Sequence, residues 1–387
     1  MERLRFKDEN NEVSKIHLKV LSEVLEKGSK KPVKDKAKYK RITVKLHLKG
    51  IEETEPVSHL KDTRPFYQRF NNEIIIGKQN YFNGSVAIVP EKYDGAICSN
   101  AIMSFKVKNI DTNYLFYQIS RRDFLKKREM LANGTGQKEL SEKDFLNFKV
   151  EVPSKLEQEK IGGFLSAFDR LIEKQREKVE LLRKFGNGLI GSKYDHLSDT
   201  EKMSRDKMKL RQVVKINPKT MKLPDKFFYI DLESVEKGEL VKISELFLNE
   251  APSRAQRLLK KYDLLFQTVR SYLGNHLLFN DNENLDYVGS TGYAQLRVID
   301  KVSYPSYIYF LFYSKDFKNK VHQLSTGSNY PAITSKSLGE IEVALPNYEY
   351  QKFLGDTLSS VFEMVLLEEK KLNHYIDMKN SYIQKLL

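Results

Sequence analysis

Several features of membrane, secreted and disulfide-bonded proteins are missing from this sequence. It contains a single cysteine, Cys98, which excludes a disulfide framework and fits a reducing cytosol. It has no run of eighteen apolar residues, so we expect no segment to span a bilayer. The first residues, MERLRFKDENNEV, lack the apolar stretch of a secretory signal. We therefore expect a cytoplasmic protein without membrane contact.

Sequence patterns of catalysis are missing as well. A methyltransferase would need an Asn/Asp-Pro-Pro-aromatic motif and a glycine-rich cofactor loop, and neither Asn217-Pro218-Lys219 nor Gly134-Thr135-Gly136 fits. No G-x-x-x-x-G-K-[ST] loop for ATP is present. The seven histidines are scattered without zinc-site spacing. We expect no catalytic residue, no metal and no cofactor in this chain.

Positive charge is what the sequence has in excess. The chain has 66 basic and 52 acidic residues, a net charge of +14. Residues 1–150 hold 30 basic and 20 acidic residues (net +10), and residues 201–350 hold 22 and 18 (net +4). The other two stretches have no net charge: residues 151–200 hold nine basic and nine acidic residues, and residues 351–387 hold five of each. A merely soluble basic protein would not show this partition, which favours a nucleic acid partner.

The longest regular pattern in the sequence runs from Pro153 to about Tyr194. Its apolar residues recur at the spacing of one helix face, and the same pattern returns at the C-terminus. Two such helices bury their apolar faces most simply as an antiparallel pair, a rod of roughly 50–60 Å. Gly186-Asn187-Gly188 should weaken or end the first helix. We expect the helices to contact each other through Ile161, Leu165, Phe168, Ile172, Val179, Leu182, Leu354, Leu358, Val361, Val365, Leu372 and Tyr375.

The stretch before the first long helix reads as short strands separated by turns. The strand segments are ITVKLHL, NEIIIGKQN, SVAIVP and AIMSFKVKN, followed by an amphipathic helix at 113–127 and a strand at 148–152. Residues 1–14 look like a loosely attached lead-in. The lysine-rich run from Lys30 to Arg41 is either a solvated loop or a set of phosphate contacts.

The chain repeats itself. A shift of 193 positions lays 134–166 on 327–359 without a gap, with eight of 33 pairs identical, against roughly two by chance. The chain is therefore predicted to be α+β, with two copies of a β-rich domain that is followed by a long helix. We expect the first domain at 1–152, its helix at 153–194, a linker at 195–206, the second domain at 207–345 and its helix at 346–387.

The segment GTGQKELSEKDFLNFKVEVPSKLEQEKIGGFLSAFDRLIEKQREKVELLRKF resembles the signature of type I restriction-modification specificity subunits. In that signature a glycine-containing loop and a strand ending in proline precede E-Q-x-x-I and L-x-x-x-D, at the start of a coiled-coil helix. The matching residues here are Glu157, Gln158, Ile161, Leu165 and Asp169. The second copy keeps Pro346, Gln351 and Leu358, but Tyr350 and Phe362 replace Glu157 and Asp169.

The resemblance implies a role in bacterial or archaeal host defence and DNA methylation. Each β-rich unit would be a target recognition domain that reads one half of a bipartite, gapped, asymmetric sequence in double-stranded DNA, and the helices would act as a spacer. The partners would be two adenine methyltransferase subunits and, in the restricting form, two translocase-nuclease subunits. Those partners would use S-adenosylmethionine, ATP and Mg²⁺. A non-catalytic architectural DNA-binding scaffold and a self-contained DNA-modifying enzyme remain as alternatives.

Candidate DNA contacts lie in loops at matching places in the two copies. Gln, Asn and Arg suit base edges, whereas Ser and Thr suit phosphates. Asn80 and Arg270 occupy the same repeat position, so the two copies would read different bases there. The alternative is that these are ordinary turn residues. The candidates are Lys78, Gln79, Asn80, Ser99, Asn100, Thr135, Gln137 and Lys138 in the first copy, and Thr268, Arg270, Ser271, Ser290, Thr291, Ser328, Asn329 and Tyr330 in the second.

Overall fold

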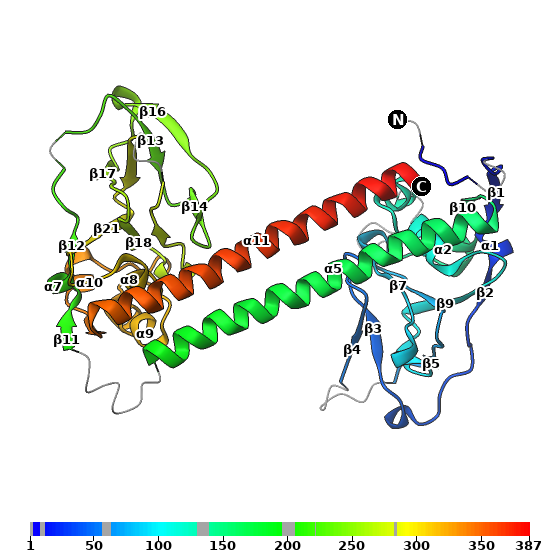
Figure 1. The fold of residues 1–387 in the computed structure, drawn as a ribbon. Coiled ribbons are helices and arrows are strands. Elements are labelled where there is room, and N and C mark those ends of the chain that lie inside the picture. Colours follow the sequence, from blue (N-terminus) through cyan, green and yellow to red (C-terminus); the bar gives the residue numbers. More distant parts are fainter. Residues whose placement is uncertain are drawn as a thin grey trace. The chain divides into compact units, whose positions relative to one another are not determined.

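The computed structural model describes residues 3–7, 12–55, 63–129, 139–195, 206–220, 222–281 and 285–387. The chain divides into two compact units (Figure 1). Unit 1 comprises Met1–Gln175 and Lys371–Leu387, and unit 2 comprises Arg176–Lys370. Two long helices, α5 (Lys155–Ile190) and α11 (Tyr348–Leu386), each contribute one part to unit 1 and the other part to unit 2.

Unit 1 is built on a four-stranded antiparallel sheet in the order β2-β9-β6-β7. One of its two inner strands, β6, carries Ile74, Ile75 and Ile76, all fully buried. Because strand side chains alternate, Ile74 and Ile76 pack into one core with the helices, while Ile75 packs into a second core on the other face. The strands are β2 (Leu25–Lys27), β6 (Ile74–Gly77), β7 (Val86–Ile88) and β9 (Ile102–Val107).

Among the described residues, unit 1 also has three two-stranded antiparallel sheets. The predicted strand ITVKLHL ends early, at Val44, because His47 and Leu48 adopt positive φ angles of 58° and 56° and turn the chain. The pairs are β1 (His17–Val20) with β10 (Lys149–Val152), β3 (Ile42–Val44) with β4 (Ile51–Glu53), and β5 (Phe66–Gln68) with β8 (Ile97–Ser99).

The helix predicted at 113–127 is two helices. Asp111 caps the first by accepting a hydrogen bond from the Tyr114 N–H, and Arg121, with an extended ψ of 143°, separates it from the second. The α-helices of unit 1 before α5 are α1 (Leu21–Val24), α2 (Thr112–Ser120), α3 (Arg122–Arg128) and α4 (Glu142–Leu146). Single 3₁₀ turns are η1 (Lys36–Lys38), η2 (Tyr81–Asn83) and η3 (Glu91–Tyr93).

Unit 2 contains two four-stranded sheets. The first is antiparallel, in the order β12-β21-β18-β19, and packs on helices through Leu264, Phe266 and Leu296. The second, β16-β13-β20-β17, contains a parallel pair, β13 with β20. The strands are β12 (Val214–Ile216), β13 (Lys226–Ile230), β16 (Ser244–Phe247), β17 (Ala255–Leu258), β18 (Leu264–Gln267), β19 (Leu277–Leu278), β20 (Tyr287–Ser290) and β21 (Tyr293–Val298).

The described part of unit 2 also has two small antiparallel pairs and several short helices. The pairs are β11 (Asp206–Lys209) with β22 (Glu342–Leu345) and β14 (Val235–Glu236) with β15 (Glu239–Leu240). The helices are α7 (Leu210–Val213), α8 (Pro305–Leu311), α9 (Lys315–Leu324), α10 (Ser335–Gly339), η6 (Leu248–Glu250) and η7 (Ser271–Leu273).

In each unit, α5 and α11 run antiparallel. In unit 1 the Phe164 and Phe168 rings lie 5.0 and 5.6 Å from the Tyr382 ring. In unit 2 Gly186 of α5 lies against Val361 and Phe362 of α11. The glycines at 186 and 188 do not end α5, which runs on to Ile190 and a π-helical turn, η5 (Gly191–Asp195). The predicted α+β fold class with an antiparallel helix pair is confirmed.

The internal repeat is visible in the contacts as well as in the order of elements. The Gln158 side chain accepts the Asp111 N–H (2.9 Å) and donates to the Pro153 carbonyl (2.8 Å). At the positions shifted by 193, Gln351 accepts the Tyr304 N–H (3.0 Å) and donates to the Pro346 carbonyl (2.8 Å). Each glutamine thus ties the start of its long helix to the domain that precedes it.

The two departures from the family signature in the second copy are matched by changes in what they touch. In unit 1 the Tyr117 hydroxyl donates to the Asp169 carboxylate, which also pairs with Lys379. In unit 2 the equivalent positions hold Phe310 and Phe362, whose ring centroids lie 5.0 Å apart. A polar contact between helix and domain in one copy is therefore an aromatic contact in the other.

Candidate nucleic-acid interface

Three loops that the sequence singled out in the second copy lie together in unit 2. The chain after β18 contacts the β20–β21 turn, because the Thr268 N–H and hydroxyl both donate to the Gly292 carbonyl (3.1 and 2.8 Å). It also contacts the 326–332 loop, since the Arg270 N–H donates to the Pro331 carbonyl (2.8 Å). Residues 268–271, 290–292 and 326–332 therefore form one surface cluster, which we call the unit 2 loop cluster.

The same arrangement recurs in unit 1. The Lys78 N–H donates to the Ala101 carbonyl (3.0 Å), which joins the chain after β6 to the β8–β9 turn. The Leu140 N–H donates to the Lys78 carbonyl (2.9 Å), as Ile333 donates to Thr268 in unit 2 (3.0 Å). Residues 78–80, 99–101 and 139–140 form the unit 1 loop cluster. The candidates Thr135, Gln137 and Lys138 lie outside the described residues.

The candidate side chains differ in accessibility. Two are buried and shape the cluster from inside: the Thr268 hydroxyl donates to Gly292, and the Ser290 hydroxyl accepts the Gly292 N–H (3.2 Å). Half-buried are Lys78, Ser99, Arg270, Ser271 and Thr291. Exposed are Gln79, Asn80, Asn100, Ser328, Asn329 and Tyr330.

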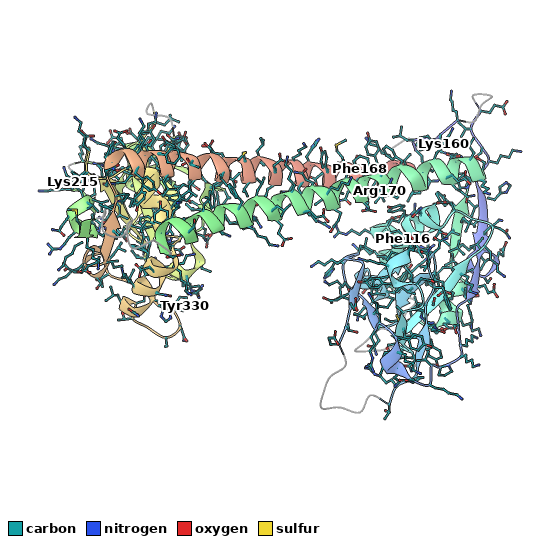
Figure 2. The ribbon with its side chains drawn as sticks, turned by 60° about the horizontal axis from the view of Figure 1, so that its bottom comes forward. Phe116, Lys160, Phe168, Arg170, Lys215 and Tyr330 are labelled. Atoms are coloured by element: carbon teal, nitrogen blue, oxygen red, sulfur yellow. The ribbon has the colours of Figure 1, made fainter. Side chains whose placement is uncertain are left out.

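Both the backbone and the side chain of Arg270 are constrained in the unit 2 loop cluster. Its φ of 52° lies in the left-handed region of the backbone, which residues other than glycine rarely adopt. Its guanidinium stacks over the Tyr330 ring, 4.1 Å from the centroid, and its Nε has no hydrogen-bond partner. Tyr330 stands in its loop at the periphery of unit 2 (Figure 2) and is 63% exposed. An arginine and an aromatic ring are thus held together at the surface.

A basic pocket of about 350 Å³ borders the unit 1 loop cluster. The candidates Lys78 and Asn100 line it, together with Lys27 and Lys30, so the start of the lysine-rich run reaches the same place. Its buried wall includes Arg69, which donates to the carbonyls of Ser29 (3.3 Å), Gln68 (3.1 Å) and Ile102 (3.0 Å). Farther along the run, Lys36 and Arg41 each lie 5.0 Å from the Phe66 ring.

The residues expected to join the helices lie along α5 and α11 with different degrees of burial. In unit 1, Ile161 and Leu165 share a core with Tyr114, Tyr117 and the Leu386 end of α11. In unit 2, Leu354 and Leu358 belong to the main core of the domain. Ile172, Val179, Val361 and Val365 are also buried, whereas Phe168, Leu182, Leu372 and Tyr375 are half-buried.

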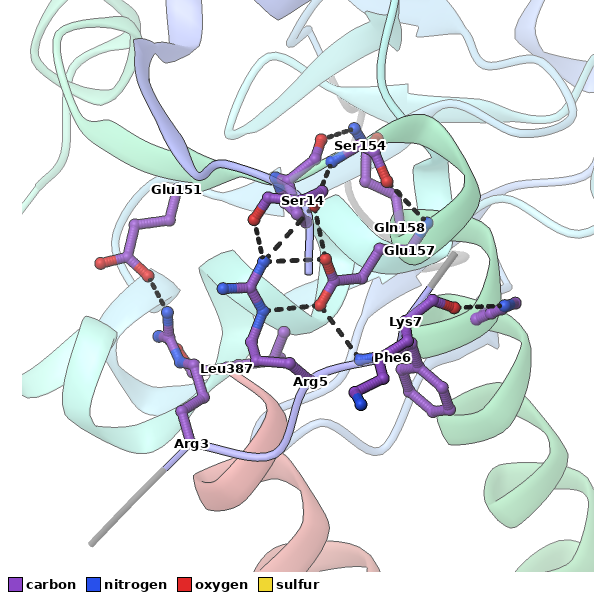
Figure 3. Close-up of polar contacts among 12 residues, drawn as sticks. Arg3, Arg5, Phe6, Lys7, Ser14, Glu151, Ser154, Glu157, Gln158 and Leu387 are labelled. Atoms are coloured by element: carbon purple, nitrogen blue, oxygen red, sulfur yellow. Dashed lines mark hydrogen bonds and ion pairs between the residues drawn. The ribbon is translucent and has the colours of Figure 1, made fainter. Parts of the chain in front are cut away.

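The sequence reasoning missed the anchoring of the N-terminal segment. Glu157, at the start of α5, accepts two hydrogen bonds from Arg5 (2.7 and 2.8 Å) and one from the Ser14 hydroxyl (2.6 Å) (Figure 3). The Leu4 N–H donates to the Lys385 carbonyl (2.8 Å). The prediction of a loosely attached lead-in is therefore wrong for the described residues 3–7 and 12–14. An arginine in the lead-in and a glutamate at a helix start were the available signal.

Two buried titratable side chains, Cys98 and His276, have shifted pKa values and belong to the packed interior. Burial raises the pKa of the Cys98 thiol to about 12. Burial, and then the charge of Lys318, lower the pKa of His276 to about 3, and its Nδ1 accepts the Gln267 N–H (3.1 Å). Within the described ranges, no group of three or more His, Cys, Asp or Glu side chains is placed to hold a metal ion. No helix there is both long and apolar enough to cross a membrane.

Comparison with known proteins decides the family. Residues 11–182 and residues 205–375 each match the family model of the type I restriction modification DNA specificity domain, so two copies account for most of the chain. The chain belongs to this family. The resemblance drawn from the helix-start signature is confirmed, and so is the internal repeat.

Named relatives agree with this assignment. The type I restriction enzyme MjaVIII specificity subunit of Methanocaldococcus jannaschii is 25% identical over 384 residues, covering 91% of this chain and 89% of that protein. The putative MjaX specificity subunit of the same organism is 22% identical over 353 residues, covering 83% and 76%. The crystal structure of a type I restriction-modification S subunit from M. genitalium matches with a TM-score of 0.66 at 16% identity, covering 100% of this chain and 99% of that chain, and shows the shared fold.

The family assignment confirms the predicted role at the level of the whole chain. The protein is a type I specificity subunit, formed by two DNA specificity domains. Because the relatives are named specificity subunits, the assignment also supports the expectation that catalysis lies outside this chain.

Proposed function

We propose that this specificity subunit reads a bipartite, asymmetric DNA target, with residues 1–152 reading one half and residues 207–345 the other. The observation that carries this proposal is the convergence of three loops in each unit, at equivalent places but with different side chains. Lys78, Gln79 and Asn80 lie where the second copy has Thr268, Val269 and Arg270. Two surfaces of the same construction and different chemistry suit two different short sequences.

The charge distribution supports double-stranded DNA as the ligand. The net charges of +10 and +4 lie in the two domain halves of the sequence, whereas the stretches of the long helices are neutral. Lysines near the unit 1 loop cluster, such as Lys30 and Lys78, are suited to phosphates, because an ammonium delivers charge without demanding a geometry. Exposed amides and the stacked arginine are suited to base edges.

The partners follow from the same proposal. The helices at 153–194 and 346–387 would set the spacing between the two recognition surfaces, and the 195–206 stretch would link the copies. Two adenine methyltransferase subunits, which use S-adenosylmethionine, would act beside the DNA. In a restricting complex, two translocase-nuclease subunits would add ATP- and Mg²⁺-dependent cleavage. Such a complex would act in the cytoplasm, where the host DNA lies.

A methylation map tests the proposal. The chain is expressed with an adenine methyltransferase subunit of a type I system from the same host, and N6-methyladenine is mapped across a genome. The expected result is one gapped motif with two unlike halves. Methylation without a gapped motif, or binding without sequence choice, would contradict it and favour an architectural role. Methylation or cleavage by the purified chain alone would favour an enzyme.

A further inference from the structure

We propose that Arg270 reads a guanine in the half-site bound by unit 2, and that Tyr330 is the positioning residue that holds its guanidinium ready. The inference rests on the DNA recognition proposed above and adds the identity of one base. It starts from two candidates, 60 residues apart in the sequence, that the fold brings into contact.

The backbone of Arg270 is held in place before any ligand binds. Its N–H donates to the Pro331 carbonyl (2.8 Å), and its carbonyl accepts the Leu273 N–H (3.0 Å). The flanking residue Val269 forms a bridge to Ala332. These bonds keep Arg270 at its positive φ of 52°. This backbone conformation is strained for a residue that carries a side chain. Backbone strain of this kind clusters at sites that bind ligands.

The side chain of Arg270 is oriented but chemically unsatisfied. Among the described residues, the contact of its guanidinium is with the Tyr330 ring, 4.1 Å from the centroid. Its Nε has no hydrogen-bond partner. Stacking fixes the plane of the guanidinium, a planar fork of N–H donors, without using those donors. Little side-chain entropy therefore remains to be lost when a ligand binds. Nearby Tyr272, 68% exposed, extends the surface.

The chemistry of the fork selects one base. A guanidinium carries donors and no acceptor. In the major groove only guanine presents two acceptors side by side, O6 and N7, whereas adenine places a donor beside N7 and thymine offers a single acceptor. The matching residue of the first copy, Asn80, has both a donor and an acceptor, as adenine does. The two copies are thus expected to differ at this position.

The test uses four variants of the full chain in complex with its methyltransferase. Arg270→Lys keeps the charge but loses the fork, and Arg270→Gly removes the side chain while accepting the positive φ without strain. Tyr330→Phe keeps the stacking ring, and Tyr330→Ala removes it. Arg211→Ala is the control: Arg211 is exposed and pairs with Glu340 (2.7 Å), and its replacement removes one positive charge from the same unit without touching a loop-cluster residue.

Motif maps and binding to base-substituted duplexes give the readout. Arg270→Gly is expected to lose preference for one G·C pair in one half-site, with discrimination falling on the order of tenfold to a hundredfold. Arg270→Lys should keep a weaker preference for the same pair, because an ammonium can still donate to guanine but lacks the planar pair of donors. Arg270→Lys should keep the salt dependence of binding. Tyr330→Ala should show a weaker loss at the same pair, Tyr330→Phe should resemble wild type, and Arg211→Ala should leave every position unchanged.

Two results would overturn the inference. One is an unchanged motif in both Arg270 variants. The other is a uniform loss of affinity in Arg270→Gly that Arg270→Lys restores, since that would mark a phosphate contact. Failure of the inference differs from failure of the proposed function, because in the latter case the wild-type complex itself would yield no gapped motif.

Discussion

At the residue scale, Glu157 gathers the polar contacts that attach the N-terminal segment. Burial raises the pKa of this carboxyl, but hydrogen bonds from Arg5 and Ser14 and the charge of Arg5 outweigh burial, so the net shift is downward. The same pairing raises the pKa of Arg5. Because the second copy has Tyr350 at this position, the anchor belongs to unit 1, and the motif glutamate there has a structural task.

Replacing Glu157 by glutamine tests this anchor. We expect Glu157→Gln to lower the free energy of unfolding of unit 1 by about 1.5–3 kcal/mol at pH 7, the range for hydrogen bonds to charged groups. The amide proton of Phe6, which donates to Glu157 Oε1 (3.3 Å), should lose protection from hydrogen exchange. Glu159→Gln is the control, because Glu159 is exposed and its pairing with Lys155 spans 3.8 Å. Equal effects of the two variants would contradict the prediction.

The same variant predicts a pH dependence. A carboxyl whose pKa is lowered on folding stabilises the fold above its unfolded pKa, about 4.3 for glutamate, and loses this contribution as the pH falls through the folded value. The difference in stability between wild type and Glu157→Gln should therefore be full at pH 7 and disappear in acid. Urea titrations at pH 7, 5 and about 3, the last below the ordinary glutamate range, measure it, and a difference that persists in acid would assign the effect to shape instead of charge.

At the element scale, two equivalent glycines let the long helices approach the domains. A Cβ on Gly162 of α5 would lie 2.8 Å from the Tyr114 backbone nitrogen at the start of α2. A Cβ on Gly355 of α11 would lie 2.8 Å from the Tyr307 nitrogen at the start of α8. The repeat therefore preserves glycine where a helix crosses the first turn of another. The neighbouring Gly163 faces open space.

Alanine at Gly162 or Gly355 should lower the stability of the protein, whereas alanine at Gly163 should raise it. We expect Gly162→Ala and Gly355→Ala each to destabilise their own unit by about 1–3 kcal/mol, because backbone atoms must move. Gly163→Ala should instead stabilise the helix by about 0.5–1 kcal/mol, because alanine has the higher helix propensity. Thermal unfolding followed by circular dichroism measures all three. A stabilising Gly162→Ala would show that α2 and α5 separate readily.

At the scale of the whole molecule, the proposed function predicts that the two halves of the target are independent. Exchanging residues 15–152 for the corresponding domain of a relative should change one half of the methylated motif and leave the other half and the gap unchanged. The reason is that each loop cluster is closed by hydrogen bonds within its own unit, as between Lys78 and Leu140. Motif mapping measures the outcome, and changes in both halves would contradict it.

Helix length is predicted to set the gap between the halves. One extra heptad after Gln175 in α5 and one after Lys370 in α11 leave the contacts inside each unit unchanged. Seven residues add about 10 Å of helix, which corresponds to about three base pairs. The gap should grow accordingly while both halves stay the same. A four-residue insertion in α5 alone is the control, since it breaks the pairing register and should abolish the motif.

Prediction from the sequence worked best where a pattern repeats over many residues. Helix α5 continues through Gly186 and Gly188, because the packing of its long apolar stripe outweighs the low helix propensity of two glycines. Local breaks escaped it: the turn at Arg121 divides α2 from α3, and the positive φ angles at His47 and Leu48 end β3. The break at Arg121 has no proline or glycine to announce it, and in the β3–β4 turn the glycine, Gly50, comes only after His47 and Leu48.

The sequence by itself determined the repeat, the two long amphipathic helices, the α+β class and the family, because each rests on periodicity or on residues near one another in the chain. Only the tertiary structure decided which distant residues meet. The contacts of Glu157 with Arg5, of Asp169 with Lys379 and of Arg270 with Tyr330 join positions far apart in the sequence. Such contacts depend on how the sheets, loops and helices pack, and no local pattern encodes them.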